Sequence, residues 1–323
     1  MLTIDPYLFT EEAIAPETKA INEQIETFLK TAPSIVDLGA VKIRELRRAG
    51  QGVLANQPEH EMAKWDTASA NGLDVPVRIF KPEGDLKAVY LHIHGGGHAI
   101  GSADAQDQTL ARMAEALSFG VVSVEYRLAP ENPWPAPADD CEAAGLWLVE
   151  NAQKLFGTDK ITVGGESAGG HLSAVTILRL KHRLGSCPFV GANLVYGAFD
   201  MSGTPKMKSW GDRNLILSGP IVDYFGEQLL PAAKFTDLDR KDPGLSPLYA
   251  DLKDLCPALF SVGTMDPIMD DTLFMAMRWL SACNEAELEI YPGGIHAFDM
   301  IPGLPIADEF HKKVDAFLAK VVA

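Results

Sequence analysis

Cysteine is scarce in this sequence and is never clustered. The four cysteines lie at positions 141, 187, 256 and 283, and no two of them form a Cys-x-x-Cys pair. This spacing indicates reduced, mostly buried thiols, which are usual in the cytoplasm. The first residues, 1–6, contain neither a basic stretch nor an apolar stretch of the kind that begins a signal peptide. We therefore expect a cytoplasmic protein.

Positive charge is also in short supply. Lysine and arginine total 28, against 44 aspartate and glutamate residues, which gives a formal net charge of −16. Such a charge argues against nucleic acid and against an anionic membrane surface as partners. Long hydrophobic runs are missing too, since no stretch is apolar enough over enough residues to span a bilayer.

What the sequence does contain is a regular alternation of strand-like and helical segments. Hydrophobic residues make up 47% of the 323 residues, enough for a large core. Asn71-Gly72 predicts a hairpin turn within 63–82. Beyond it we expect strands at 88–94, 121–126, 161–163, 190–195, 258–262 and 286–291, and helices at 105–117, 138–151, 168–184, 272–282 and 307–321. The alternation predicts an α/β fold with a mainly parallel central sheet and helices on both faces.

Two segments interrupt this alternation. Residues 1–60 contain two amphipathic helical patterns, from Ala20 to Leu29 and from Leu38 to Leu46. Residues 200–245 surround a helical centre at 220–230 and follow a strand, which places them at the edge of the sheet where ligands bind in such folds. We interpret both segments as a helical cap on a catalytic domain formed by 61–323. The alternative for 1–60 is simple packing on the core.

The motif Gly165-Glu166-Ser167-Ala168-Gly169 lies between the strand at 161–163 and the helix at 168–184. Small residues at both ends of the motif allow a sharp strand-to-helix turn, which exposes the serine hydroxyl. The Ala168 amide then lies at a helix N-terminus, where an oxyanion is favoured. These features make Ser167 a candidate nucleophile.

A serine nucleophile needs a general base, and histidine is the usual one. His296 is the best placed of the eight histidines because it follows a strand and a glycine turn, whereas His311 is expected to be a solvated helix residue. The supporting acid should lie between the serine and the histidine in the chain, at a strand end. Asp266 meets both requirements. Asp270 and Asp271 are interpreted as N-terminal charges of the following helix.

A second motif, His94-Gly95-Gly96-Gly97, follows the first long strand. Glycine leaves its amide group unobstructed, so we expect Gly95 and Gly96, together with Ala168, to hold an oxyanion. Three glycines alone could form a merely flexible turn, but their combination with the serine motif argues against that interpretation.

His92, His94 and His98 form a group for which a metal ion has to be considered. His92 and His94 are two residues apart on a predicted strand and so share one face, which can suit zinc. Because His94 adjoins the glycines, we favour a structural imidazole that hydrogen-bonds the loop backbone, and no metal is expected.

Together, these motifs resemble those of the hormone-sensitive lipase family of bacterial carboxylesterases, which have the α/β-hydrolase fold. The resemblance is strong over 90–298 and also rests on the motifs at 125–131, 266–270 and 296–298. It implies a catalytic triad and an oxyanion hole formed by Ser167, Asp266, His296, Gly95, Gly96 and Ala168. It also implies a small, neutral, short-chain acyl ester as substrate, no cofactor, and dimerisation through an edge strand.

Three positions depart from the family pattern. Glu125 replaces a usual Asp, His98 replaces a bulky aromatic residue, and Ala297 replaces a usual Gly. These changes bear on substrate preference, and His98 adds a titratable side chain beside the pocket. An amidase, lactonase or deacetylase would need the same triad, so these activities stay open. A non-catalytic binding protein on the same scaffold is disfavoured because all three triad residues are present.

Overall fold

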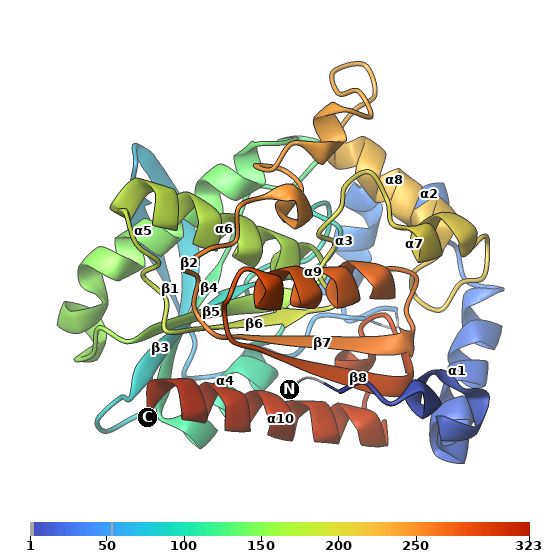
Figure 1. Ribbon diagram of the computed structural model, residues 1–323, viewed down its shortest axis with the longest axis horizontal. Helices are drawn as coiled ribbons and strands as arrows, with labels where there is room; N and C mark the ends of the chain where they lie inside the picture. The colour runs from blue at the N-terminus through green and yellow to red at the C-terminus, as the bar shows by residue number, and fades with distance from the viewer. Residues whose placement is uncertain (1–2, 53) are drawn as a thin grey trace.

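The computed structural model describes residues 3–52 and 54–323, which form one eight-stranded sheet flanked by helices (Figure 1). The strands occur in the order β1-β2-β4-β3-β5-β6-β7-β8. Strands β3 to β8 are parallel to one another, whereas β1 and β2 are antiparallel to their neighbours. Their bounds are Lys64–Ala70, Leu73–Phe80, Ala88–Ile93, Phe119–Val124, Ile161–Glu166, Gly191–Val195, Ala258–Met265 and Ala286–Ile295. The expected α/β architecture is confirmed.

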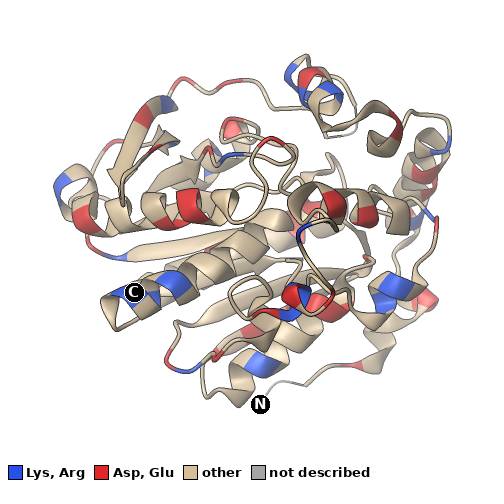
Figure 2. Cartoon of the chain, turned by 90° about the horizontal axis from the view of Figure 1, so that it is seen from above, with Lys and Arg blue, Asp and Glu red and all other residues tan. Residues whose placement is uncertain are grey.

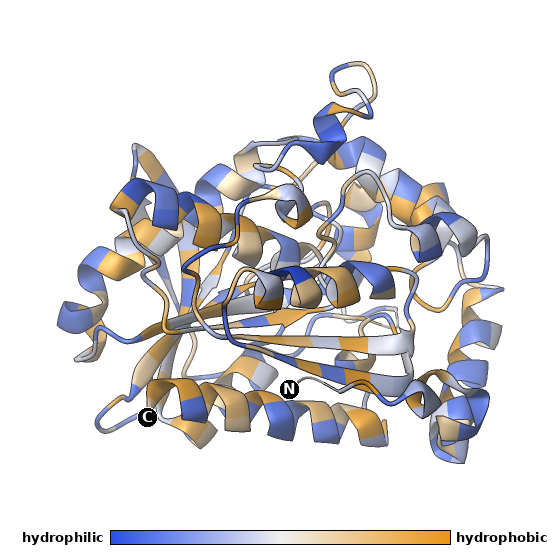
Figure 3. Ribbon diagram, viewed as in Figure 1, coloured by the Kyte–Doolittle hydropathy of each residue, from blue (hydrophilic) through white to orange (hydrophobic). Residues whose placement is uncertain are grey.

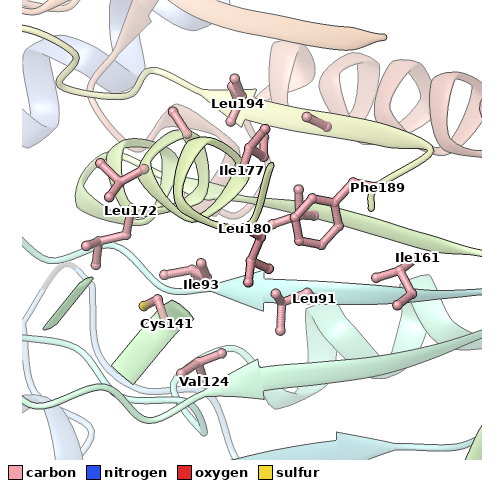
Figure 4. Close-up of a cluster of buried hydrophobic side chains, with 14 of the residues drawn as sticks. Leu91, Ile93, Val124, Cys141, Ile161, Leu172, Ile177, Leu180, Phe189 and Leu194 are labelled. Atoms are coloured by element: carbon pink, nitrogen blue, oxygen red, sulfur yellow. The ribbon is translucent and has the colours of Figure 1, made fainter. Parts of the chain in front are cut away.

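Helices cover both faces of the sheet. Helices α5, α6 and α9 pack on one face, and Leu91, Leu172 and Leu180 interdigitate there (Figure 4). Helices α4 and α10 cover the other face, where Leu110 and Phe317 are buried. The central strands are almost continuously apolar because both of their sides are covered (Figure 3). Charged side chains concentrate on the surrounding helices and loops (Figure 2).

The helix bounds agree with the expected elements and extend several of them. The α-helices are α1 Pro16–Leu29, α2 Ile35–Leu38, α3 Ala40–Arg48, α4 Asp107–Leu117, α5 Ala136–Phe156, α6 Ala168–Leu184, α7 Pro205–Ser209, α8 Gly219–Leu229, α9 Met269–Ser281 and α10 Pro305–Val322. Short 3-10 helices lie at Pro6–Phe9, Glu11–Ala13, Asp239–Lys241, Pro247–Tyr249 and Phe298–Met300. Helix α5 continues past the expected end because its first stop signal is Gly157, which caps it in the left-handed conformation.

Two local turns follow directly from their glycines. In the predicted hairpin, Asn71 and Gly72 have φ values of 53° and 76°, as the tightest hairpin turns require. The prediction of one continuous helix from Leu38 to Leu46 is wrong. The helix is divided at Gly39, where φ is 80°, so that Leu38 ends α2 and Ala40 begins α3.

The N-terminal helices and the segment after β6 lie together in space (Figure 1). The Ala40 amide donates to the Tyr224 hydroxyl at 2.8 Å. Arg213 forms an ion pair with Glu26 at 3.1 Å. Segments that are more than 150 residues apart in sequence are thereby joined next to the edge of the sheet where the parallel strands end. Within the described ranges, none of the helices combines the length and apolarity needed to cross a membrane.

Candidate active site

Ser167 occupies the sharp turn between β5 and α6. Its φ and ψ values are 57° and −117°, a conformation that L-residues adopt only when the surroundings enforce it. The surroundings here are close backbone contacts, because a Cβ atom on either Gly165 or Gly169 would collide with the Ile93 carbonyl. The Ser167 amide donates to the Val195 carbonyl at 2.9 Å and fixes the turn on β6. The side chain remains partly exposed.

Three side chains that the sequence analysis singled out lie in one hydrogen-bonded series. His296 follows β8, and its Nε2 atom is 2.9 Å from the Ser167 hydroxyl oxygen. Its Nδ1 atom is 2.8 Å from a carboxylate oxygen of Asp266, which follows β7 and is fully buried. A carboxylate only accepts hydrogen bonds, so Nδ1 carries the proton and Nε2 is left to accept the serine proton. This is the geometry that general-base activation of a serine requires.

The glycine loop after β3 leaves amide groups without partners. The amides of Gly95, Gly96 and Ala168 donate to no acceptor among the described residues. Gly95 packs directly against the serine turn, because a Cβ atom there would lie 2.8 Å from the Glu166 carbonyl and 3.6 Å from the Ser167 Cβ. Gly96 has a φ of 113°, which L side chains rarely adopt. Free donors of this kind suit a developing oxyanion.

The histidines before the glycine loop are held by protein groups. His92 lies 2.9 Å from the Ser123 hydroxyl and 3.1 Å from Glu166. His94 contacts the Gly95 carbonyl at 2.8 Å and stacks on Tyr126 at 4.1 Å between ring centroids. Burial lowers the pKa of His94 to about 4, so it is neutral and supports the loop through Nδ1. No set of three His, Cys, Asp or Glu side chains in 3–52 and 54–323 is arranged to hold a metal ion.

His98 is not the titratable group that its sequence position suggested. It is only 4% exposed, and its Nε2 lies 2.9 Å from Nδ1 of the fully buried His171. His171 in turn donates through Nε2 to the Leu245 carbonyl at 2.7 Å, so its Nδ1 accepts a hydrogen bond from the His98 Nε2–H group. Burial holds the pKa of His98 well below its usual value and lowers that of His171 to about 4. His98 therefore adds a neutral, rigid side chain to the wall of the site.

Tyr196 and Asp299 support His296, and the sequence analysis missed both. Tyr196 follows β6, and its ring lies 4.8 Å from the His296 ring. Its hydroxyl donates to the buried Asp299, whose pKa is raised to about 7 by burial. His311 lies in α10, as expected, but it is half-buried and its side chain donates to the Asp299 carbonyl at 3.2 Å. The position of Tyr196 at a strand end is the one signal that could have identified this pair.

Asp270 and Asp271 lie in the first turn of α9, as expected, but they also bind groups outside the helix. Asp271 accepts hydrogen bonds from the amides of Phe199 and Asp200 and from the Thr204 hydroxyl, at 2.7–2.8 Å. Asp270 accepts from the Lys206 amide at 2.8 Å. Burial raises the pKa of Asp271 to about 7. These carboxyl groups therefore anchor the segment after β6 to the helix that follows Asp266.

Ser167 and His296 open into a cavity of about 1070 Å³. The sheet edge contributes the floor, with Gly95, Gly96 and Gly97. The walls come from the N-terminal helices and from the segment after β6, which contribute apolar side chains that include Ile35, Leu46, Leu217, Ile221 and Phe225. A mostly apolar cavity with a few convergent polar groups is typical of a site for a small organic molecule.

Comparisons with known proteins agree with this geometry. A family profile described as alpha/beta hydrolase fold matches residues 90–300. Carboxylesterase NlhH of Mycobacterium tuberculosis is 33% identical over 273 residues, which cover 83% of each protein. Ethyl acetate hydrolase of Pseudomonas putida is 27% identical, with coverage of 88% of this chain and 92% of that protein. The crystal structure of a hormone-sensitive lipase from a metagenome library has a TM-score of 0.81 at 26% identity, with coverage of 95% of this chain and 98% of that one.

Proposed function

The chain belongs to the α/β-hydrolase fold family, among the carboxylesterases related to hormone-sensitive lipase, and from this premise we propose that it hydrolyses short-chain acyl esters with Ser167 as nucleophile. The observation that carries the proposal is the hydrogen-bonded series from Ser167 through His296 to Asp266. The Pseudomonas putida relative is an ethyl acetate hydrolase, which supports a short acyl chain.

In the proposed reaction, the Ser167 oxygen bonds to the ester carbonyl carbon while its proton passes to His296. The tetrahedral oxyanion is stabilised by the amides of Gly95, Gly96 and Ala168. Collapse breaks the bond to the alcohol oxygen, which takes the proton from His296 and leaves. Water then attacks the acyl-enzyme, gives a proton to His296, and releases the carboxylic acid and the free serine. Asp266 keeps the imidazole oriented and stabilises the imidazolium in both halves.

We also propose that 1–60 and 200–245 form a cap over the catalytic domain of 61–323. The hydrogen bond from Ala40 to Tyr224 and the ion pair between Arg213 and Glu26 support a cap with two joined parts. A cytoplasmic location is proposed on the four free thiols. Dimerisation through an edge strand stays a prediction, with β1 and β8 as the two edges of the sheet.

The test is labelling with a fluorophosphonate, followed by intact-protein mass spectrometry. We expect one adduct on the native protein and none on Ser167→Ala, which should also lose turnover of ethyl butyrate. Ser281→Ala is the matched control, because Ser281 is an exposed serine at the end of α9. Persistence of the adduct in Ser167→Ala would contradict the assignment. Ethyl butyrate and its isosteric amide, assayed side by side, distinguish an esterase from an amidase.

A further inference from the structure

Arg47 differs from the other arginines of the protein. Nine of these are bound to carboxylates or carbonyl groups within the fold. Arg44 pairs with Glu131, for example, and Arg240 binds the Leu230 carbonyl. Arg48 has no such partner but is exposed to solvent. Arg47 is only partly exposed, and its Nε atom is shielded from solvent without any hydrogen-bond partner among the described residues.

The position of Arg47 connects it with the candidate active site. It lies in the last turn of α3 and lines the same cavity as Ser167 and His296. Burial lowers the pKa of its guanidinium to about 10, so the group is still charged at neutral pH. Tyr126 supplies no negative charge to it, because burial raises the pKa of that phenol well above its usual value. His94, whose pKa is lowered to about 4, is neutral and adds no second positive charge.

A partly buried charge without a partner is unfavourable unless a ligand supplies the opposite charge. A guanidinium presents a planar fork of donors that matches a carboxylate in a bidentate arrangement. One cation compensates one negative charge, so a singly charged group fits better than a dianionic phosphate. Exposed carboxylates at the cavity, including Asp212, Asp223 and Glu227, disfavour a dianion further.

The order of the strands indicates which half of an ester would face Arg47. Arg47 lines a small pocket with Gly101 and Ser102, which follow β3, whereas His296 follows β8, and Ser167 lies between them after β5. The leaving alcohol must lie next to His296 to receive its proton. The acyl half therefore extends in the opposite direction, toward the loop after β3 and Arg47.

On the basis of the proposed esterase function, we propose that Arg47 binds a carboxylate at the far end of the acyl chain, so that the preferred substrates are monoesters of short dicarboxylic acids. This differs from the neutral ester expected from the family resemblance. The net charge of −16 does not oppose it, because that charge is a property of the whole chain, whereas Arg47 acts inside the cavity.

The test compares kcat/KM for monoethyl succinate, glutarate and adipate, each against the isosteric ethyl ester that ends in a carboxamide. We expect the native protein to prefer the carboxylate roughly 10- to 100-fold for at least one chain length, from the strength of a charge-assisted bond. Arg47→Gln should abolish this preference and Arg47→Lys should retain part of it. Arg48→Gln, which removes an equal charge one residue away outside this cavity, should keep the native ratio.

Several results would overturn the proposal. These are the absence of a preference in the native protein, an equal loss on both members of a pair in Arg47→Gln, and a preference found only when the carboxylate is on the alcohol half, as in 3-acetoxypropanoate. A lower melting temperature in Arg47→Gln would also overturn it, because it would indicate a structural role. Cleavage of ethyl butyrate that depends on Ser167 is measured in parallel, so failure of the carboxylate preference is distinguishable from failure of the proposed function.

Discussion

The buried pair of His98 and His171 predicts a specific loss of stability in acid. His171 is fully buried, with its Nε2 bound to Leu245, and burial lowers its pKa from 6.5 to about 4. Between about pH 6.5 and about pH 4, His171 is therefore protonated in the unfolded chain but stays neutral in the folded protein. A group with a depressed folded pKa contributes stability above its unfolded pKa, and this contribution falls as the pH falls from about 6.5 to about 4.

The magnitude follows from the two pKa values. Between about pH 8 and about pH 5, proton binding to His171 in the unfolded state alone should lower the free energy of unfolding by about 2 kcal/mol. The total pH dependence of the protein is not the right readout, because Asp271 and Asp299 have pKa values raised to about 7 and favour the folded state toward acid. The contribution of His171 is isolated by comparing how much free energy of unfolding the native protein and His171→Gln each lose between the two pH values.

The assay is urea unfolding at both pH values for three proteins. His171→Gln keeps an amide donor for the Leu245 carbonyl and removes the titration, so its stability should fall by about 2 kcal/mol less than that of the native protein over this range. His182→Gln makes the same substitution at an exposed position of the same helix and should behave as the native protein does. If His171→Gln and the native protein lose the same free energy, burial does not hold this imidazole neutral, and the reasoning is refuted.

Two further predictions concern the site. Gly169→Ala places a Cβ against the Ile93 carbonyl and should lower the free energy of unfolding by about 1–3 kcal/mol. Gly226→Ala, within α8, places a Cβ no closer than 3.6 Å to any other heavy atom and should raise the free energy of unfolding by about 0.5–1 kcal/mol. Urea unfolding of both variants checks the two signs. Tyr196→Phe removes the donor to the buried Asp299 and should cost about 1–3 kcal/mol of stability and lower kcat, and an unchanged kcat would mean that this pair does not position His296.

Local signals in the sequence were enough for much of the architecture. The hairpin at Asn71-Gly72 and the serine turn between Gly165 and Gly169 depend on backbone conformations that few residues allow, so the residues that permit them mark the turns. The proximity of Ser167, Asp266 and His296 could be expected because each follows a parallel strand, and these strands end at one edge of the sheet.

Contacts between distant segments could not be predicted in this way. Asp271 has the sequence context of an ordinary helix N-terminus, and only the fold brings Phe199 and Thr204 to it. His98 has the appearance of an accessible titratable residue until His171, 73 positions later, buries it. The absence of a partner for Arg47 is likewise a property of the assembled cavity, since nothing in the residues next to it distinguishes it from Arg48.

The unpartnered amides of Gly95, Gly96 and Ala168 have a thermodynamic consequence for the whole protein. An anionic adduct on Ser167 would occupy these donors in the folded protein alone, since the unfolded chain does not bring the three amides together. Any ligand that binds only the folded state stabilises it, by about 2.7 kcal/mol when its concentration is 100 times its dissociation constant. Boronic acids, which form tetrahedral anions on serine, should therefore raise the melting temperature according to how well they fit. Heat denaturation alone would then rank acyl groups without any substrate being turned over.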